Sequence, residues 1–170
     1  MPDFSSILNK IFGKDTPEYR NLTESEKNVI MKDVYERGDR IMRIFFCIHA
    51  LIAMALACFY DTWLVTAVVG GAALAMFVIS VYLLPRHFIT RCIAGFSLQL
   101  FVALHIYQMH GLAEMHFFFF TGITMMLVYQ DWVSMWPGVV FIIVQHTVFA
   151  IYHNQGVPLY FFEDNYISIL

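Results

Sequence analysis

Apolar residues along this chain gather into five long stretches that are separated by very short polar breaks. The stretches cover residues 41–60, 62–84, 88–109, 113–132 and 136–155. Each holds about 20 residues, which at about 1.5 Å per residue can cross a hydrocarbon core of roughly 30 Å. The breaks are so short that consecutive helices must run in opposite directions. We therefore predict an all-α, integral membrane, antiparallel helix bundle with five transmembrane helices over residues 41–156.

The first 40 residues have a different pattern and carry most of the charge. Apolar residues recur at helical spacing within 3–13, which predicts an amphipathic helix in a juxtamembrane segment spanning 1–40. Thr23 and Glu26 have the spacing of a capping box. A second helix should therefore begin near residue 24 and run into the first span, because no proline interrupts it.

Composition supports the membrane interpretation, and the distribution of charge gives an orientation. The chain of 170 residues is 59% hydrophobic and 14% charged, whereas a soluble domain is nearer one quarter charged. All ten lysines and arginines precede the first span or flank the turn between the second and third. Under the positive-inside rule this side is cytoplasmic, which predicts a multi-pass protein with a cytoplasmic N-terminus.

The C-terminal residues 157–170 turn apolar again just before the chain stops. We interpret them as the start of a sixth span that is cut short, so that the parent protein would continue into the cytoplasm. A short outer tail is the alternative.

Histidines gather where the outer ends of spans three, four and five should meet. Counting residues along these spans places five histidines and one glutamate in the outer half of the bundle. The candidate metal ligands are His116, His146, Glu114, His105, His110 and His153. We expect His49, by contrast, to lie apart near the inner side of span one as a structural residue.

This set of side chains is typical of a metal site between helices. Imidazole is the commonest metal ligand, and histidines with a carboxylate suit copper, iron or zinc. Two histidines that face each other could instead hold a haem. The histidines could also serve only as hydrogen-bonding groups that satisfy polar atoms between helices.

At the inner side of the bundle, Asp131 could form an ion pair with Arg86 or Arg91.

Three short segments resemble a known family. Glu114-Met115-His116-Phe117, Tyr129-Gln130-Asp131-Trp132 and the later His146 are similar to the N-terminal multi-span sensor region of bacterial signalling proteins. In that family a cytoplasmic methyl-accepting, histidine kinase or nucleotide cyclase module follows the membrane region. The resemblance covers roughly 41–165 and implies a sensory role in the bacterial inner membrane. Family members often have paired histidines where this chain has Gln145 and His146.

Three functions remain open at this point. The first is a membrane sensor that binds a transition metal and relays its state to a cytoplasmic output domain. The second is a haem-binding or metal-dependent redox membrane protein, and the third is a structural anchor for a dimeric signalling protein. The sequence has no motif typical of a catalytic site, so we expect no catalytic activity in this chain. It has no basic patch suited to nucleic acid away from the membrane, and the expected partners are the lipid bilayer and a second copy of the chain.

Overall fold

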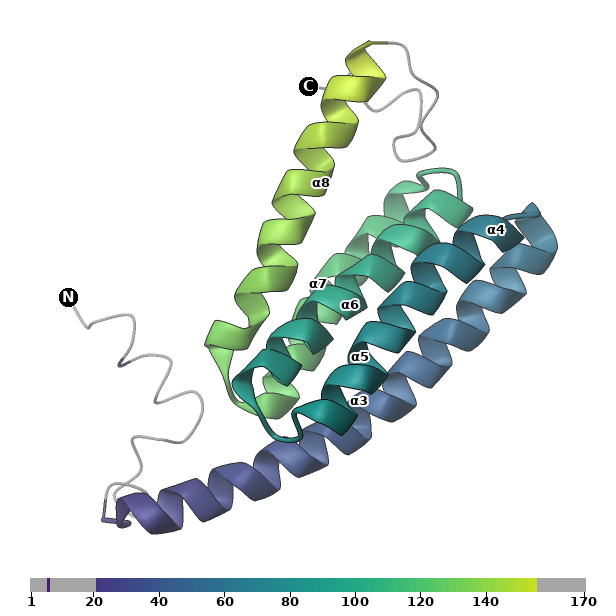
Figure 1. Cartoon of the computed structure of the whole chain (residues 1–170). Helices are drawn as coiled ribbons and strands as arrows, with labels where there is room; N and C mark the ends of the chain where they lie inside the picture. The colour runs from purple at the N-terminus through teal and green to yellow at the C-terminus, as the bar shows by residue number, and fades with distance from the viewer. Residues whose placement is uncertain (1–5, 7–20, 156–170) are drawn as a thin grey trace.

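The computed structural model describes residue 6 and residues 21–155 (Figure 1). All secondary structure in this part of the chain is helical, which confirms the all-α prediction. The predicted amphipathic helix over 3–13, except for residue 6, and the tail 157–170 lie outside the described residues.

The first long helix, α3, spans Glu24–Tyr60 and begins as the sequence predicts. The backbone N–H of Thr23 donates to Glu26 Oε2 at 2.8 Å, and the Thr23 hydroxyl accepts from the Glu26 backbone at 3.4 Å. Hydrogen bonds from the Thr23 hydroxyl and backbone lower the pKa of the Glu26 carboxyl. The helix ends at Asp61, which adopts the left-handed conformation with φ of 51°.

The second and third helical segments follow after short turns. Helix α4 (Trp63–Val65), the π-helical turn η1 (Thr66–Gly70) and helix α5 (Gly71–Leu83) form one continuous helical segment. Helix α6 then spans Phe88–Gln108. These bounds differ from the predicted spans by only one residue at most ends.

The last two segments are less regular. The 3-10 turn η2 (Ala113–His116), helix α7 (Phe117–Met125) and the 3-10 turn η3 (Met126–Tyr129) follow one another without a break. After a tight turn, the 3-10 turn η4 (Trp132–Met135) leads into helix α8 (Trp136–Asn154).

Helix α6 is the central element, with α3 and α5 on one side and α7 and α8 on the other (Figure 1). Its most apolar window is 67% buried, compared with 28% or less for the other long helices. Helix α8 diverges from the bundle toward its C-terminal end (Figure 1). Helix α8 contacts α6 and is the least buried of the four long helices.

Four helices of the described chain are long and apolar enough to cross a membrane. They are Glu24–Tyr60, Trp63–Leu83, Phe88–Gln108 and Trp132–Tyr152. The segment predicted as the fourth of five spans is the shorter apolar stretch Glu114–Tyr129.

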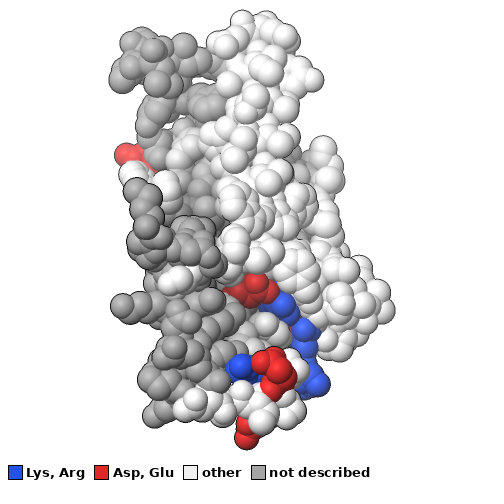
Figure 2. All heavy atoms as spheres, turned by 90° about the vertical axis from the view of Figure 1, so that its left-hand side faces the viewer, with Lys and Arg blue, Asp and Glu red and all other residues white. Residues whose placement is uncertain are grey.

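On the face shown in Figure 2, the Lys and Arg side chains that the structure describes lie at one end of the molecule, together with most of the Asp and Glu side chains in view. We call this the basic end, defined by Arg86 and Arg91 where α5 turns into α6. The opposite end, where α3 turns at Asp61 and α6 ends at Gln108, is called the far end.

Candidate functional site

The structure brings together two of the predicted ligands, His116 and His146, from different helical segments. His116 ends the turn η2, and His146 lies in the middle of α8. Their ring centroids are 5.8 Å apart and their planes meet at 67°. Both side chains are partly buried. Of the six predicted ligands, these two histidines are the ones whose rings lie close to each other in the described structure.

Main-chain hydrogen bonds fix which nitrogen of each ring could bind a ligand. His116 Nδ1 lies 3.3 Å from the carbonyl oxygen of Leu112, and His146 Nδ1 lies 2.9 Å from that of Ile142. A carbonyl oxygen only accepts, so each Nδ1 carries a proton and the lone pair of the neutral ring is on Nε2. Histidines that bind metals usually donate their second ring N–H in this way. In both rings, Nε2 is therefore the nitrogen whose lone pair could bind a metal ion.

An aromatic ring packs beside the pair, and a carboxylate lies close to His116 in the sequence. The ring of Phe119 lies 5.1 Å from that of His146 and 6.3 Å from that of His116. Glu114 is exposed and lies two residues before His116 in the same turn. Phe119 covers one side of the pair. Glu114, although predicted as a ligand, does not form a three-residue group with the two histidines in the described structure.

Gln145, the neighbour of His146 on α8, has a buried side chain whose amide atoms lack a hydrogen-bond partner. The residue is 8% exposed, and neither its oxygen nor its nitrogen is paired in the described structure. An unpaired buried amide costs about 1–3 kcal/mol, so this group favours an additional polar species at this level of α8.

His105 does not join this pair, contrary to the predicted clustering, and instead contacts His49 of α3. His49 Nδ1 and His105 Nε2 are 2.9 Å apart, and the two rings are nearly parallel at 17°. Both side chains are buried, with 3% and 0% exposed. The expectation that His49 lies apart from the other histidines was therefore wrong.

The histidine contact continues into a buried hydrogen-bond network centred on Gln108. Its amide nitrogen, which has two hydrogens, lies within hydrogen-bonding distance of three acceptors: the carbonyl of Ala53 at 2.9 Å and the hydroxyls of Thr62 at 3.1 Å and Thr66 at 2.8 Å. The amide oxygen consequently faces His105 Nδ1, at 3.4 Å. The network joins α3, the turn η1 and α6 near the far end, and it satisfies polar groups that would be costly in hydrocarbon.

The remaining predicted ligands lie apart from the pair or cannot be placed. The ring of His110 contacts Tyr60, with centroids 5.3 Å apart. His153 belongs to α8, but its side chain lies outside the described residues. Among the residues that the structure describes, no three or more of His, Cys, Asp and Glu lie together as a metal site.

A second polar cluster, at the basic end, was only partly anticipated from the sequence. The hydroxyl of Tyr129 donates to Asp39 Oδ1 of α3 at 2.8 Å. The Tyr129 ring packs against Gly38, where an added Cβ would lie 2.5 Å from the ring. Tyr129, Asp39 and Gly38 are all buried. The turn after η3 is thereby held against the first long helix.

An ion pair holds the same turn against α6. Arg91 Nε and a terminal nitrogen bind one oxygen of Asp131 at 3.0 Å and 2.8 Å. The two side chains are only 7% and 15% exposed. The guanidinium also lies 3.7 Å from the ring centroid of Tyr35 on α3. Of the two predicted partners of Asp131, Arg91 is the observed one, while Arg86 pairs with Glu36. We call Asp39, Arg91, Tyr129 and Asp131 the basic-end clasp.

No protein-family model, curated protein or solved structure matches this chain. The resemblance to bacterial sensor regions thus rests on the sequence motifs.

Proposed function

We propose that the chain is a membrane-embedded sensory module that binds a transition metal through His116 and His146. Copper, iron and zinc are the candidate ions. The observation that supports the proposal is the pair of rings on separate helical segments, each with its Nδ1 hydrogen-bonded to a main-chain carbonyl. In keeping with the family resemblance, we place the chain in a bacterial inner membrane, as a homodimer that signals to a cytoplasmic output domain.

The proposal includes five membrane spans, of which Glu114–Tyr129 is the shortest. Seven of its sixteen residues lie in the 3-10 turns η2 and η3. A 3-10 turn rises about 2.0 Å per residue and an α-helix about 1.5 Å, which gives roughly 28 Å in total. This length is close to a hydrocarbon core of roughly 30 Å. The larger rise per residue of the 3-10 turns thus compensates for the small number of residues in this span.

Orientation follows from the charges. The basic end is cytoplasmic under the positive-inside rule, so that the histidine pair lies in the outer half.

The donor set fits a transition metal in its chemistry. Two neutral imidazoles suit copper, iron and zinc. Gln145 offers a further polar group beside His146. Because hydrogen bonds already orient the two rings, little side-chain freedom would be lost on binding.

The same segments that carry the pair lead directly to the basic-end clasp. From His116 the chain runs through α7 to Tyr129, and from Asp131 it runs through η4 to His146. A ligand that binds one spacing of His116 and His146 more tightly than another shifts the population of helix arrangements accordingly. Such a shift would reach α3 through the contact of Tyr129 with Asp39.

Elemental analysis and a visible spectrum of the purified full chain test the proposal. We expect about one copper, iron or zinc ion per chain, and we expect the His116→Ala, His146→Ala double variant to lose it. His110→Asn is the matched control, since it removes a histidine of the same end, and asparagine tolerates the positive φ of 54° at that position. The control should retain the metal.

Two results would contradict the proposal. Folded wild-type protein that takes up no copper, iron or zinc on reconstitution would exclude the metal site. A strong Soret band that disappears in the double variant would show that the pair holds haem instead of an ion.

A further inference from the structure

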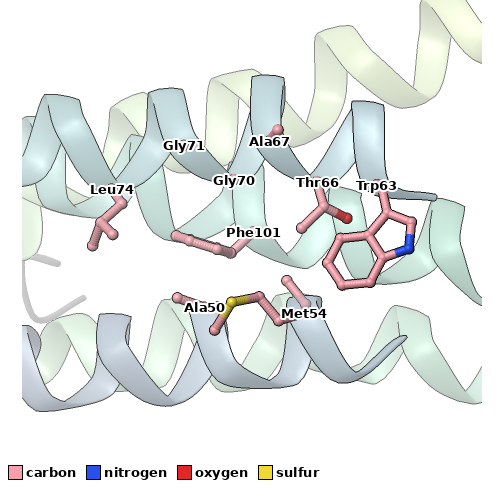
Figure 3. Close-up of a pocket in the computed structure, with 10 residues that line it drawn as sticks. Ala50, Met54, Trp63, Thr66, Ala67, Gly70, Gly71, Leu74 and Phe101 are labelled. Carbon is pink, nitrogen blue, oxygen red and sulfur yellow. The ribbon is translucent and has the colours of Figure 1, made fainter. Parts of the chain in front are cut away.

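Two adjoining cavities lie on the outer face of the bundle between α3 and α5. The first has a volume of about 290 Å³ and is lined mainly by small residues, with Met54, Trp63 and Phe101 at its sides (Figure 3). The second has a volume of about 300 Å³ and reaches Arg43 and Tyr82. Leu74 lines both. The two cavities therefore lie end to end along the α3–α5 seam with Leu74 between them, and we call them together the α3–α5 groove.

Small residues line the part of this groove that lies farther from Arg43. Ala50 and Ala53 of α3 face Gly70 and Gly71 across the seam. A Cβ on Gly70 would meet Leu104 at 3.2 Å, whereas a Cβ on Gly71 would meet nothing within 4 Å. The wall behind Gly70 is thus packed, while Gly71 opens onto empty space. A groove of this shape, with an apolar lining, accepts hydrocarbon in preference to water.

A single cationic group marks one end of the groove. Arg43 is the only charged residue among those that line the two cavities in the described chain. It lies on the basic-end side of the groove, near the exposed ring of Tyr82. A guanidinium binds phosphate well, and a tyrosine commonly lies at the level of lipid headgroups. The groove is thus complementary to a molecule with an anionic head and an apolar tail.

The length of the groove agrees with one leaflet of a bilayer. Met54 follows Arg43 by eleven residues on the same helix. At about 1.5 Å per residue this corresponds to about 16 Å, which is close to half of a hydrocarbon core of roughly 30 Å. An acyl chain whose headgroup lies at Arg43 would therefore reach the small residues at the far end of the groove.

We propose that the α3–α5 groove binds one acyl chain of an anionic phospholipid from the leaflet at the basic end, with its phosphate at Arg43. The proposal requires the chain to lie in a membrane but does not depend on the metal site. Arg43 supplies selectivity for the headgroup, and the space beside Gly71 accommodates the tail.

Spin-labelled lipids test the headgroup. The full chain is reconstituted in phosphatidylcholine bilayers with a trace of spin-labelled phosphatidylglycerol or phosphatidylcholine, and the motionally restricted fraction is measured by electron paramagnetic resonance. We expect a severalfold preference for phosphatidylglycerol. Arg43→Gln should abolish it, and Arg40→Gln, which removes an exposed arginine outside the groove, should preserve it. Equal binding of the two lipids by wild type, or a preference unchanged in Arg43→Gln, would overturn the proposal.

A plug in the groove tests the tail. The Cβ that Gly71→Phe adds meets no atom within 4 Å, and Gly71 is exposed, so the fold should tolerate the substitution. We expect it to lower the preference for phosphatidylglycerol, whereas Ala72→Phe, at an exposed neighbour outside the groove, should not. A plug variant that keeps the full preference would overturn the proposal. Metal content is measured on the same samples, so failure of the lipid site and failure of the metal site are read separately.

Discussion

Two glycines on neighbouring helices should respond in opposite ways to the same substitution by alanine. Gly38 of α3 lies against Tyr129, and an added Cβ would be 2.5 Å and 2.6 Å from two ring atoms. Gly71 of α5 would place its Cβ in open space. Both positions are helical, so the change in backbone propensity is shared and the difference reports the packing at the basic-end clasp.

The magnitudes follow from a short comparison of free energies. Replacing a helical glycine by alanine stabilises a helix by about 0.8–1 kcal/mol, and Gly71→Ala should show this gain. In Gly38→Ala, overpacking against a buried ring costs about 1–3 kcal/mol. Displacing that ring also breaks the bond from Tyr129 to Asp39, a hydrogen bond to a carboxylate worth about 1.5–3 kcal/mol. The net destabilisation expected for Gly38→Ala is therefore about 1.5–5 kcal/mol.

Unfolding in mixed detergent micelles with increasing sodium dodecyl sulfate, followed by circular dichroism, measures both variants against wild type. Tyr129→Phe serves as the control, because it removes the hydroxyl without adding volume and should account for only the hydrogen-bond part of the loss. The reasoning is refuted if Gly38→Ala is as stable as wild type, or if both glycine variants shift in the same direction.

Two further predictions concern the charged groups. Asp131→Asn should destabilise the fold by about 3–5 kcal/mol, because it leaves the buried guanidinium of Arg91 without its counter-charge. In the same unfolding assay, the double variant Arg91→Met, Asp131→Leu should lose less stability than the sum of the two single changes. At the start of α3, the pKa of Glu26 is lowered in the folded state, so the carboxylate stabilises the helix start above the usual glutamate pKa. This stabilisation is lost as the pH falls through the lowered value. Backbone chemical shifts of residues 24–27 should therefore move toward coil values on acidification, and Glu26→Gln should show no such titration.

Hydrophobic patterning predicted the helices well because each span ends at a strong local signal. The capping box at Thr23 and Glu26, the break at Asp61 and the turn before Phe88 are all visible in the sequence and recur in the structure. Patterning was less informative for Glu114–Tyr129, where the 3-10 turns depend on packing against neighbouring helices.

The contact between His49 and His105 was missed because the heights of residues on α3 and α6 were counted from the wrong starting residues. Levels were counted from the starts of the apolar stretches, residue 41 for the first span and residue 88 for the third, which placed His49 low in the bundle and His105 high. In the structure, Tyr35 of α3 lies against Arg91 of α6, and both histidines follow these residues by fourteen positions. They therefore lie at the same level. The sequence offered both Arg86 and Arg91 as partners of Asp131, and the stacking of Arg91 on Tyr35, which fixes the level of α3 against α6, depends on tertiary packing.

Buried polar contacts join α3 to α6 and to η3, whereas α8 is the least buried of the four long helices. Helix α3 is fixed to α6 by the network of His49, His105 and Gln108, and to the turn after η3 by the bond between Asp39 and Tyr129. Helix α8 packs closely against α6 at Gly138 and again through Ile142 and Phe149, but it is the least buried of the four long helices. Segments with few buried contacts move at the lowest cost in free energy. A ligand at His116 and His146 would therefore act on α8 and α7, and the clasp is where their motion meets α3. On this reasoning, replacing Tyr129 should uncouple the N-terminal half of α3 from the ligand, whereas replacing His105 should weaken the bundle without uncoupling it.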